Sequence, residues 1–163
     1  TACSLGRRFG LVTLCADQSE DYSDMMVAYG LERRFAGAVA LDPPIDEFAL
    51  EADEATARTI EARFDEAAAR VVARGADIII PADGVLNEFL VRRGRLKSQG
   101  DVPVMDSLGV LFQHAAYLAR LARTTGSGVS RRQLYTKPTQ AMVDHVRRCA
   151  GQRPLASDFS GDR

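Results

Sequence analysis

Four short apolar runs alternate with helix-forming stretches along this 163-residue chain, and the alternation restricts the fold more than any other feature. The runs are uninterrupted, rich in Val, Ile and Leu, and bounded by polar residues, Gly or Pro. Uninterrupted apolar strands joined by helices are typical of a parallel sheet covered on both faces. The sequence therefore predicts an α/β fold, a four-stranded parallel sheet flanked by helices in the Rossmann-like or flavodoxin-like class. The predicted strands are residues 9–15, 35–41, 76–82 and 102–106.

The stretches between the runs carry helix signals. Residues 51–74 have acidic residues early, Arg70 and Arg74 late, and Gly75 directly after them, in the order that the helix dipole and a glycine cap favour. Each of the other strands is likewise followed by a helical pattern. Further helices are predicted from Asp17 or Ser19 to about Leu31, over residues 84–94, and over residues 108–126 with Asp106 or Ser107 as the N-cap.

Composition indicates one folded domain followed by a short tail. Hydrophobic residues make up 46% of the chain and charged residues 26%, which are ordinary values for a globular protein. We expect an α/β lobe over residues 1–126, a C-terminal segment with a short helix over residues 127–150, and a disordered tail over residues 151–163. The short helix is expected to begin at Pro138, because proline is favoured in the first turn of a helix.

The last third of the chain is basic, with nine Lys or Arg against three Asp or Glu from Leu108 onward. This charge either attracts an anion or a nucleic acid, or belongs to a solvated helix face and a loose tail. We favour the second interpretation, since aromatic residues scarcely interleave with the basic ones. Arg131 and Arg132 leave a similar choice between phosphate binding and the packing of a C-terminal segment.

Several classes of protein are excluded by motifs that the sequence lacks. No apolar run approaches the roughly 20 residues of a membrane span, and no secretory signal opens the chain, so we expect a cytoplasmic protein. The three cysteines lack CxxC spacing, which argues against a disulfide framework or a zinc site. His114 and His145 are interpreted as having no metal ligand at i+4, so no metal is expected. No GxGxxG follows the first strand and GxxxxGK[ST] is absent, so no nucleotide cofactor is expected.

The carboxyl ends of the predicted strands collect hydroxyl and carboxylate groups. Ligands of open parallel sheets bind outside this edge, where helix N-termini supply unpaired N–H groups. Asp83 follows the third strand directly, and it is expected either to take part in acid–base chemistry or to cap the next helix. Thr13, at the end of the first strand, either binds a ligand or packs as an ordinary strand residue. Asp106 is expected to be a helix cap, and Cys15 a small buried residue rather than a reactive thiol.

Five stretches, taken in order, resemble the Asp/Glu/hydantoin racemase superfamily: "LGRRFGLVTL", "YGLERRF", "GADIIIPADGVLNEFL", "VPVMDSLGVLFQHAAYLARL" and "SRRQLYTKP". They look like the second half of its hydantoin/allantoin racemase branch, over about residues 5–138. The resemblance implies a pseudo-symmetric pair of α/β lobes, with the active site in the cleft between them and one catalytic cysteine in each lobe. We therefore expect that an N-terminal lobe is missing upstream of Thr1, or that a homo-oligomer replaces it.

By the resemblance, aligned without gaps from Gly75, the family's second cysteine corresponds to Asp83. If the alignment is shifted to match Gly84, it corresponds to Ala82, which has no acid–base group. The thiol is absent in either alignment. A thiolate, with a pKa near 8.5, suits proton exchange at carbon better than a carboxylate, with a pKa near 3.9. By the resemblance, Asp83 is still the candidate catalytic residue. The candidate substrate-binding residues are Thr13, Ala82, Gly84 and Val85.

The expected function is a cofactor-independent, racemase-like isomerase that acts at a carbon next to a carbonyl, with a hydantoin, allantoin or an amino acid as its small-molecule substrate. One alternative is a decarboxylase or cis–trans isomerase of the same superfamily. Another is a non-catalytic small-molecule-binding or assembly protein, which the missing thiol favours. A nucleic-acid-associated protein that uses the basic tail is the weakest interpretation.

Overall fold

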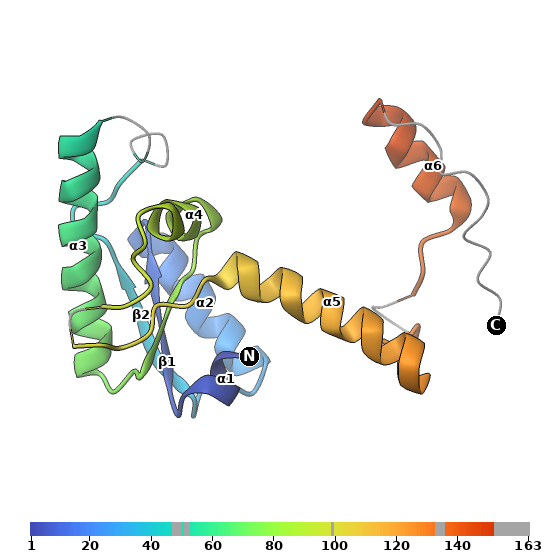
Figure 1. Cartoon of the computed structure of the whole chain (residues 1–163), viewed down its shortest axis with the longest axis horizontal. Coiled ribbons are helices and arrows are strands. Elements are labelled where there is room, and N and C mark those ends of the chain that lie inside the picture. The colour runs from blue at the N-terminus through green and yellow to red at the C-terminus, as the bar shows by residue number, and fades with distance from the viewer. Residues whose placement is uncertain (47–49, 51–52, 99, 133–135, 152–163) are drawn as a thin grey trace. The chain divides into compact units, whose positions relative to one another are not determined.

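The structure is a computed structural model that describes residues 1–46, 50, 53–98, 100–132 and 136–151 (Figure 1). Contacts divide the chain into two units, Thr1–Tyr117 and Leu118–Arg163. The finer boundaries predicted at residues 126 and 150 stay a prediction. The elements are α1 (Ala2–Leu5), β1 (Phe9–Thr13), α2 (Ala16–Ala28), β2 (Phe35–Ala40), α3 (Glu54–Ala73), β3 (Ile78–Pro81), α4 (Gly84–Arg92), α5 (Ser107–Thr125) and α6 (Gln140–Cys149).

The strands form one parallel sheet in the order β2-β1-β3. The central strand β1 is buried along its whole length, which explains its uninterrupted apolar sequence. The predicted α/β class is confirmed, and so is the parallel sheet flanked by helices.

The prediction of a fourth strand is wrong. Residues 102–106 meet β3 through a single parallel bridge, between Ile79 and Val104. Its two hydrogen bonds run from Ile79 N to Pro103 O at 2.9 Å and from Met105 N to Ile79 O at 2.8 Å. The next ladder bond on one side would need the N–H of Pro81, and on the other side that of Pro103. Because proline has no N–H, the ladder cannot extend in either direction.

Two apolar layers cover the sheet, one on each face. On one face α3 and α4 pack around Phe64, Ile79 and Leu86. On the other face Phe9 and Met26 belong to a second cluster, built from α1, α2 and the sheet. Figure 1 shows α3 on one side of the strands and the α1–α2 pair on the opposite side. The sheet edge at the carboxyl ends of β1 and β3 is thereby held from both faces.

The long helix α3 begins one turn later than the sequence predicts. Its N-cap is Asp53, whose side chain accepts a hydrogen bond from Thr56 N, and residue 51 lies outside the described residues. The helix packs closely on β1. A Cβ added to Gly10 of β1 would lie only 1.9 Å from Cγ1 of Val71 on α3. Gly75 follows the helix with a φ of 94°, which supports the predicted glycine stop.

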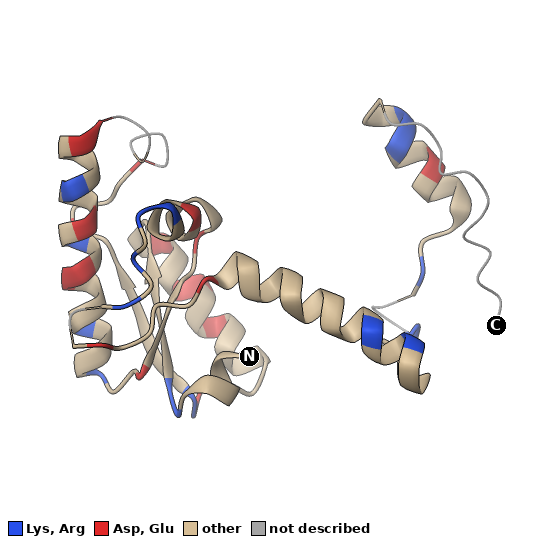
Figure 2. Ribbon diagram, in the orientation of Figure 1, with Lys and Arg blue, Asp and Glu red and all other residues tan. Residues whose placement is uncertain are grey.

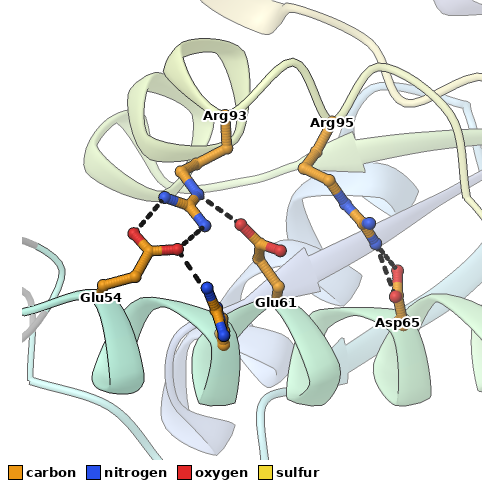
Figure 3. A network of polar contacts seen from close by, with 6 residues as sticks. Glu54, Glu61, Asp65, Arg93 and Arg95 are labelled. Carbon is orange, nitrogen blue, oxygen red and sulfur yellow. Dashed lines mark hydrogen bonds and ion pairs between the residues drawn. The ribbon is translucent and has the colours of Figure 1, made fainter.

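Ion pairs join the end of α4 to the exposed side of α3 (Figure 3). Arg93 makes a bidentate contact with Glu54, at 2.8 and 2.9 Å, and a further contact with Glu61. Two residues later Arg95 pairs with Asp65. Bidentate arginine–carboxylate geometry fixes orientation as well as distance. These contacts hold α4, and thus the turn that precedes it, against the main layer of the fold.

The second unit contains the end of α5 and the helix α6. Thr139 caps α6 by accepting a hydrogen bond from Met142 N at 3.3 Å, so the helix starts two residues after Pro138. Figure 2 shows Lys and Arg in this unit on the end of α5, the segment after it, and α6. Residues 152–163 of the tail predicted over residues 151–163, and the end of the "SRRQLY" stretch, lie outside the described residues. In the part of the chain that the structure describes, no helix combines the length and apolar character needed to cross a membrane.

Candidate functional site at the carboxyl edge of the sheet

Asp83 caps α4 at the carboxyl end of β3. Its Oδ1 accepts hydrogen bonds from Val85 N at 2.8 Å and from Leu86 N at 3.4 Å. Within the described part of the chain, both hydrogen bonds of the carboxylate go to this one oxygen. Capping therefore occupies Oδ1 and leaves Oδ2 outside the cap. The alternative that Asp83 is an N-cap is confirmed as geometry, and its catalytic role stays a prediction.

Gly84 and Val85 follow Asp83 as the first residues of α4. Gly84 is exposed, and a Cβ built there would have no atom within 4 Å, so the space in front of the helix N-terminus is open. The side chain of Val85 is 39% exposed. The helix N-terminus was predicted to supply unpaired N–H groups, but the N–H groups of Val85 and Leu86 donate to the Asp83 carboxylate. Their role toward a substrate stays a prediction.

Ala82 directly precedes Asp83, and both its N–H and its carbonyl are hydrogen-bonded. Its N–H donates to Val12 O at 2.9 Å, which continues the pairing of β1 with β3. Its carbonyl accepts a hydrogen bond of 2.8 Å from the Tyr22 hydroxyl on α2. Burial, followed by the negative charge of Asp83, raises the pKa of Tyr22 above its ordinary value. Tyr22 therefore belongs to this edge, and the sequence reasoning missed it.

Thr13 lies at the same edge, because the register pairs the preceding residue, Val12, with Pro81. Its side chain is fully buried. The hydroxyl donates to Cys15 O at 2.9 Å and lies 3.1 Å from Ser19 Oγ. These contacts fit the packed strand residue that the sequence left open as one alternative. A contact between Thr13 and a substrate stays a prediction.

A buried amide joins α4 to the start of α5 at the next position along the edge. Asn87 is 1% exposed, its Nδ2 donates to Asp106 Oδ1 at 3.1 Å, and its Oδ1 accepts from Ser107 N at 2.7 Å. Asp106 caps α5 by accepting from Gly109 N at 2.8 Å. That hydrogen bond, with the second one from Asn87, holds the pKa of the Asp106 carboxyl below its usual range. Asp106 is thus a helix cap, as expected.

A hollow of about 440 Å³ opens beside this edge, on the α1–α2 side of the sheet. Its walls are mostly apolar. Of the five candidate site residues only Ala82 lines it, whereas Thr13, Asp83, Gly84 and Val85 do not. The lining includes Phe9, Tyr22, Met25, Ile80, Met105 and Leu111. The hollow and the polar edge are therefore neighbours that meet at Ala82 and Tyr22.

The cysteines and histidines do not form a site of their own among the described residues. Cys15 occupies the N-cap position of α2 without capping it through its side chain. The statement that His145 has no ligand at i+4 is wrong, since Cys149 lies there with its Sγ 3.7 Å from His145 Nε2. The described chain nevertheless contains no group of three or more His, Cys, Asp or Glu side chains arranged to hold a metal ion.

Comparison with known proteins gives a family and a fold. The sequence profile of the Asp/Glu/hydantoin racemase family matches residues 1–115. An allantoin racemase from Klebsiella pneumoniae superposes with a TM-score of 0.62 and 21% identity, covering 84% of this chain and 51% of that one. An allantoin racemase from Pseudomonas fluorescens superposes with a TM-score of 0.61 and 26% identity, covering 84% and 54%. The chain thus spans about half the length of these structures. Among curated proteins there is no significant match.

Proposed function

The chain belongs to the Asp/Glu/hydantoin racemase family, and from this premise we propose that it forms one lobe of a cofactor-independent, racemase-like isomerase. The substrate class is a small molecule with an acidic C–H beside a carbonyl: a hydantoin, allantoin or an amino acid. The observation that carries the proposal is the position of Asp83. Its carboxylate stands at the carboxyl end of β3 and at the N-terminus of α4, where ligands of open α/β sheets bind.

In this mechanism Asp83 is the acid–base group of the lobe. Oδ2 takes the proton from the substrate carbon, or returns one, while Oδ1 remains the helix cap. The electron pair of the C–H bond moves onto the neighbouring carbonyl, whose developing charge the positive N-terminal end of the α4 dipole stabilises. A group on the opposite side of the substrate supplies the other proton.

We propose that the opposite group comes from a second α/β lobe, and that the substrate lies in the cleft between the lobes. That lobe belongs either to the same polypeptide or to a second copy of this chain. The half-length coverage of the allantoin racemase structures supports this arrangement. So does the uncovered apolar surface at the hollow, which includes Leu111 on α5.

The second candidate is a non-catalytic binding or assembly protein with the racemase fold. The observation in its favour is the cap itself, because an N-cap accounts for Asp83 without any chemistry. A decarboxylase or cis–trans isomerase of the same superfamily would use the same edge for a different reaction. Cytoplasmic location stays part of the proposal.

The test measures hydrogen exchange at the substrate carbon in heavy water. The full-length natural polypeptide is incubated with hydantoins, allantoin and amino acids, and proton NMR follows the signal beside the carbonyl. We expect this signal to disappear with the unchanged protein and to persist with Asp83→Asn. Asparagine caps helices as well as aspartate does, so this variant removes the base and keeps the helix start.

The matched control is Glu88→Gln, which removes an exposed carboxylate from the same helix and is expected to leave exchange unchanged. Thermal unfolding checks that both variants are folded. Exchange by the Asp83→Asn protein at the rate of the unchanged protein would remove Asp83 from the mechanism. No exchange with any substrate by the folded, unchanged protein would favour the binding protein.

A further inference from the structure

A side chain from another element of the fold, that of Tyr22, bonds the turn between β3 and α4. It lies on α2, and its hydroxyl donates a hydrogen bond of 2.8 Å to Ala82 O, sixty positions away in the sequence. Ala82 immediately precedes Asp83, so this bond is made one residue from the proposed acid–base group. The ring lines the hollow beside the site. Tyr22 thus fixes the turn from the α2 side of the sheet.

The N–H and the carbonyl of Ala82 are hydrogen-bonded by different elements of the fold. Its N–H is bound by Val12 O in the sheet, and its carbonyl is bound by Tyr22. Beyond Ala82, the turn is held by the cap bond from Val85 N to Asp83 Oδ1. Removal of the Tyr22 hydroxyl would take away the hydrogen bond to the carbonyl of the peptide between Ala82 and Asp83, while the sheet would still hold the preceding peptide through Ala82 N. The peptide between Ala82 and Asp83 sets the direction in which the Asp83 carboxylate points.

The hydroxyl is also suited to remain a donor next to a carboxylate. Burial and the nearby charge of Asp83 both raise the pKa of Tyr22 from 10.0, so the phenol stays protonated at physiological pH. A neutral O–H can donate to Ala82 O without placing a second negative charge beside Asp83.

We propose that Tyr22 is a positioning residue of the site: it holds the Ala82 carbonyl and thereby the orientation in which the turn presents Asp83 to a substrate. This inference rests on the proposed function of Asp83. Tyr22 does not itself exchange a proton with the substrate. It acts through the turn, so its loss is expected to lower the rate of the chemical step more than the affinity for substrate.

The test compares Tyr22→Phe with Tyr29→Phe in the full-length protein. Both variants lose one phenolic hydroxyl at α2, and Tyr29, the residue that ends this helix, is 68% exposed. Amide hydrogen exchange is measured at residues 82–86, with the buried α3 residue Phe64 as the reference for global folding. Substrate deuteration in heavy water is measured in parallel, with kcat and KM determined separately.

For Tyr22→Phe we expect about tenfold faster amide exchange at residues 82–86 with unchanged exchange at Phe64, and about tenfold lower kcat at unchanged KM. Tyr29→Phe should match the unchanged protein in every measurement. If the unchanged protein is active and Tyr22→Phe retains its kcat, the positioning role is overturned while the proposed function stands. If the folded, unchanged protein deuterates no substrate, the proposed function fails and the positioning role fails with it.

Discussion

At the scale of single residues, Asn87 is the side chain at the carboxyl edge of the sheet whose removal should lower the stability of the fold most. Its side chain donates to Asp106 and accepts from the Ser107 N–H and hydroxyl, at distances of 2.7 to 3.1 Å, in a buried position. Asn87→Ala would leave these partners without the amide and open a small void. We expect the free energy of unfolding to fall by about 2 kcal/mol in urea titrations. Glu88→Ala, one position along on the exposed side, should change it by less than about 0.5 kcal/mol.

Whether a residue's role could be predicted from the sequence depends on how far along the chain its hydrogen-bond partner lies. The capping of α4 by Asp83 and of α5 by Asp106 could be predicted, because a cap bonds residues two or three positions along the chain. Asn87 and Tyr22 could not, since their partners lie 19, 20 and 60 positions away. No local pattern specifies such contacts. His145 differs, because its neighbour Cys149 stands at helical spacing and was visible in the sequence.

At the scale of elements, sequence patterns were sufficient to predict the helices α2 to α5 and three strands. Apolar residues of the strands and of α2 to α4 lie in the two buried clusters, as their sequence patterns predict. The prediction of a fourth strand was wrong because it used only the apolar character of a short run and did not consider which hydrogen bonds the run could make. Pro81 and Pro103 remove the two N–H groups that would extend the ladder beyond the bridge at Ile79. Both prolines were present in the sequence, so this correction needed pairing to be worked out residue by residue.

The contact between α3 and α4 gives a prediction about acid. The hydrogen bonds from Arg93, followed by a smaller one from Arg58, lower the pKa of Glu54 from 4.5 to about 2. A carboxylate whose pKa is lowered in the folded state stabilises the folded protein at pH values above the ordinary pKa of that group. This stabilisation is lost as the pH falls toward the lowered pKa. We therefore expect Arg93→Gln to lower the thermal midpoint at pH 5, and the deficit to shrink between pH 4.5 and pH 2.

The control for this prediction is Lys97→Gln, which removes a more exposed ion pair with Asp101. Exposed pairs contribute little to stability, so this variant should follow the unchanged protein across the same pH range. Thermal unfolding at pH 5, 4, 3 and 2 measures all three proteins. A deficit of Arg93→Gln that stayed constant down to pH 2 would show that Glu54 is not the group that titrates.

At the scale of the whole molecule, α5 is a helix that the described fold leaves uncovered. Within the first unit, none of its residues from Ser107 to Tyr117 is buried. Residues 108–119 contain no Asp, Glu, Lys or Arg, and the corresponding part of α5 in Figure 2 carries no charged colour. Leu111 and Phe112 are 60% and 70% exposed. A soluble helix rarely keeps an uncharged stretch of this length in water, so a second protein surface is expected to cover it.

This expectation is tested on the 163-residue chain by size-exclusion chromatography with light scattering. Alone, the chain should self-associate through α5, because apolar surface removed from water stabilises the contact in proportion to its area. Leu111→Glu places a charge in the middle of the apolar surface and should give the mass of a single chain. Gln113→Glu adds the same charge two positions further, about 200° around the helix, and should leave the assembly intact. If the unchanged chain has the mass of one copy at every concentration, α5 is stable in water without a partner, and the uncovered helix no longer supports a second lobe.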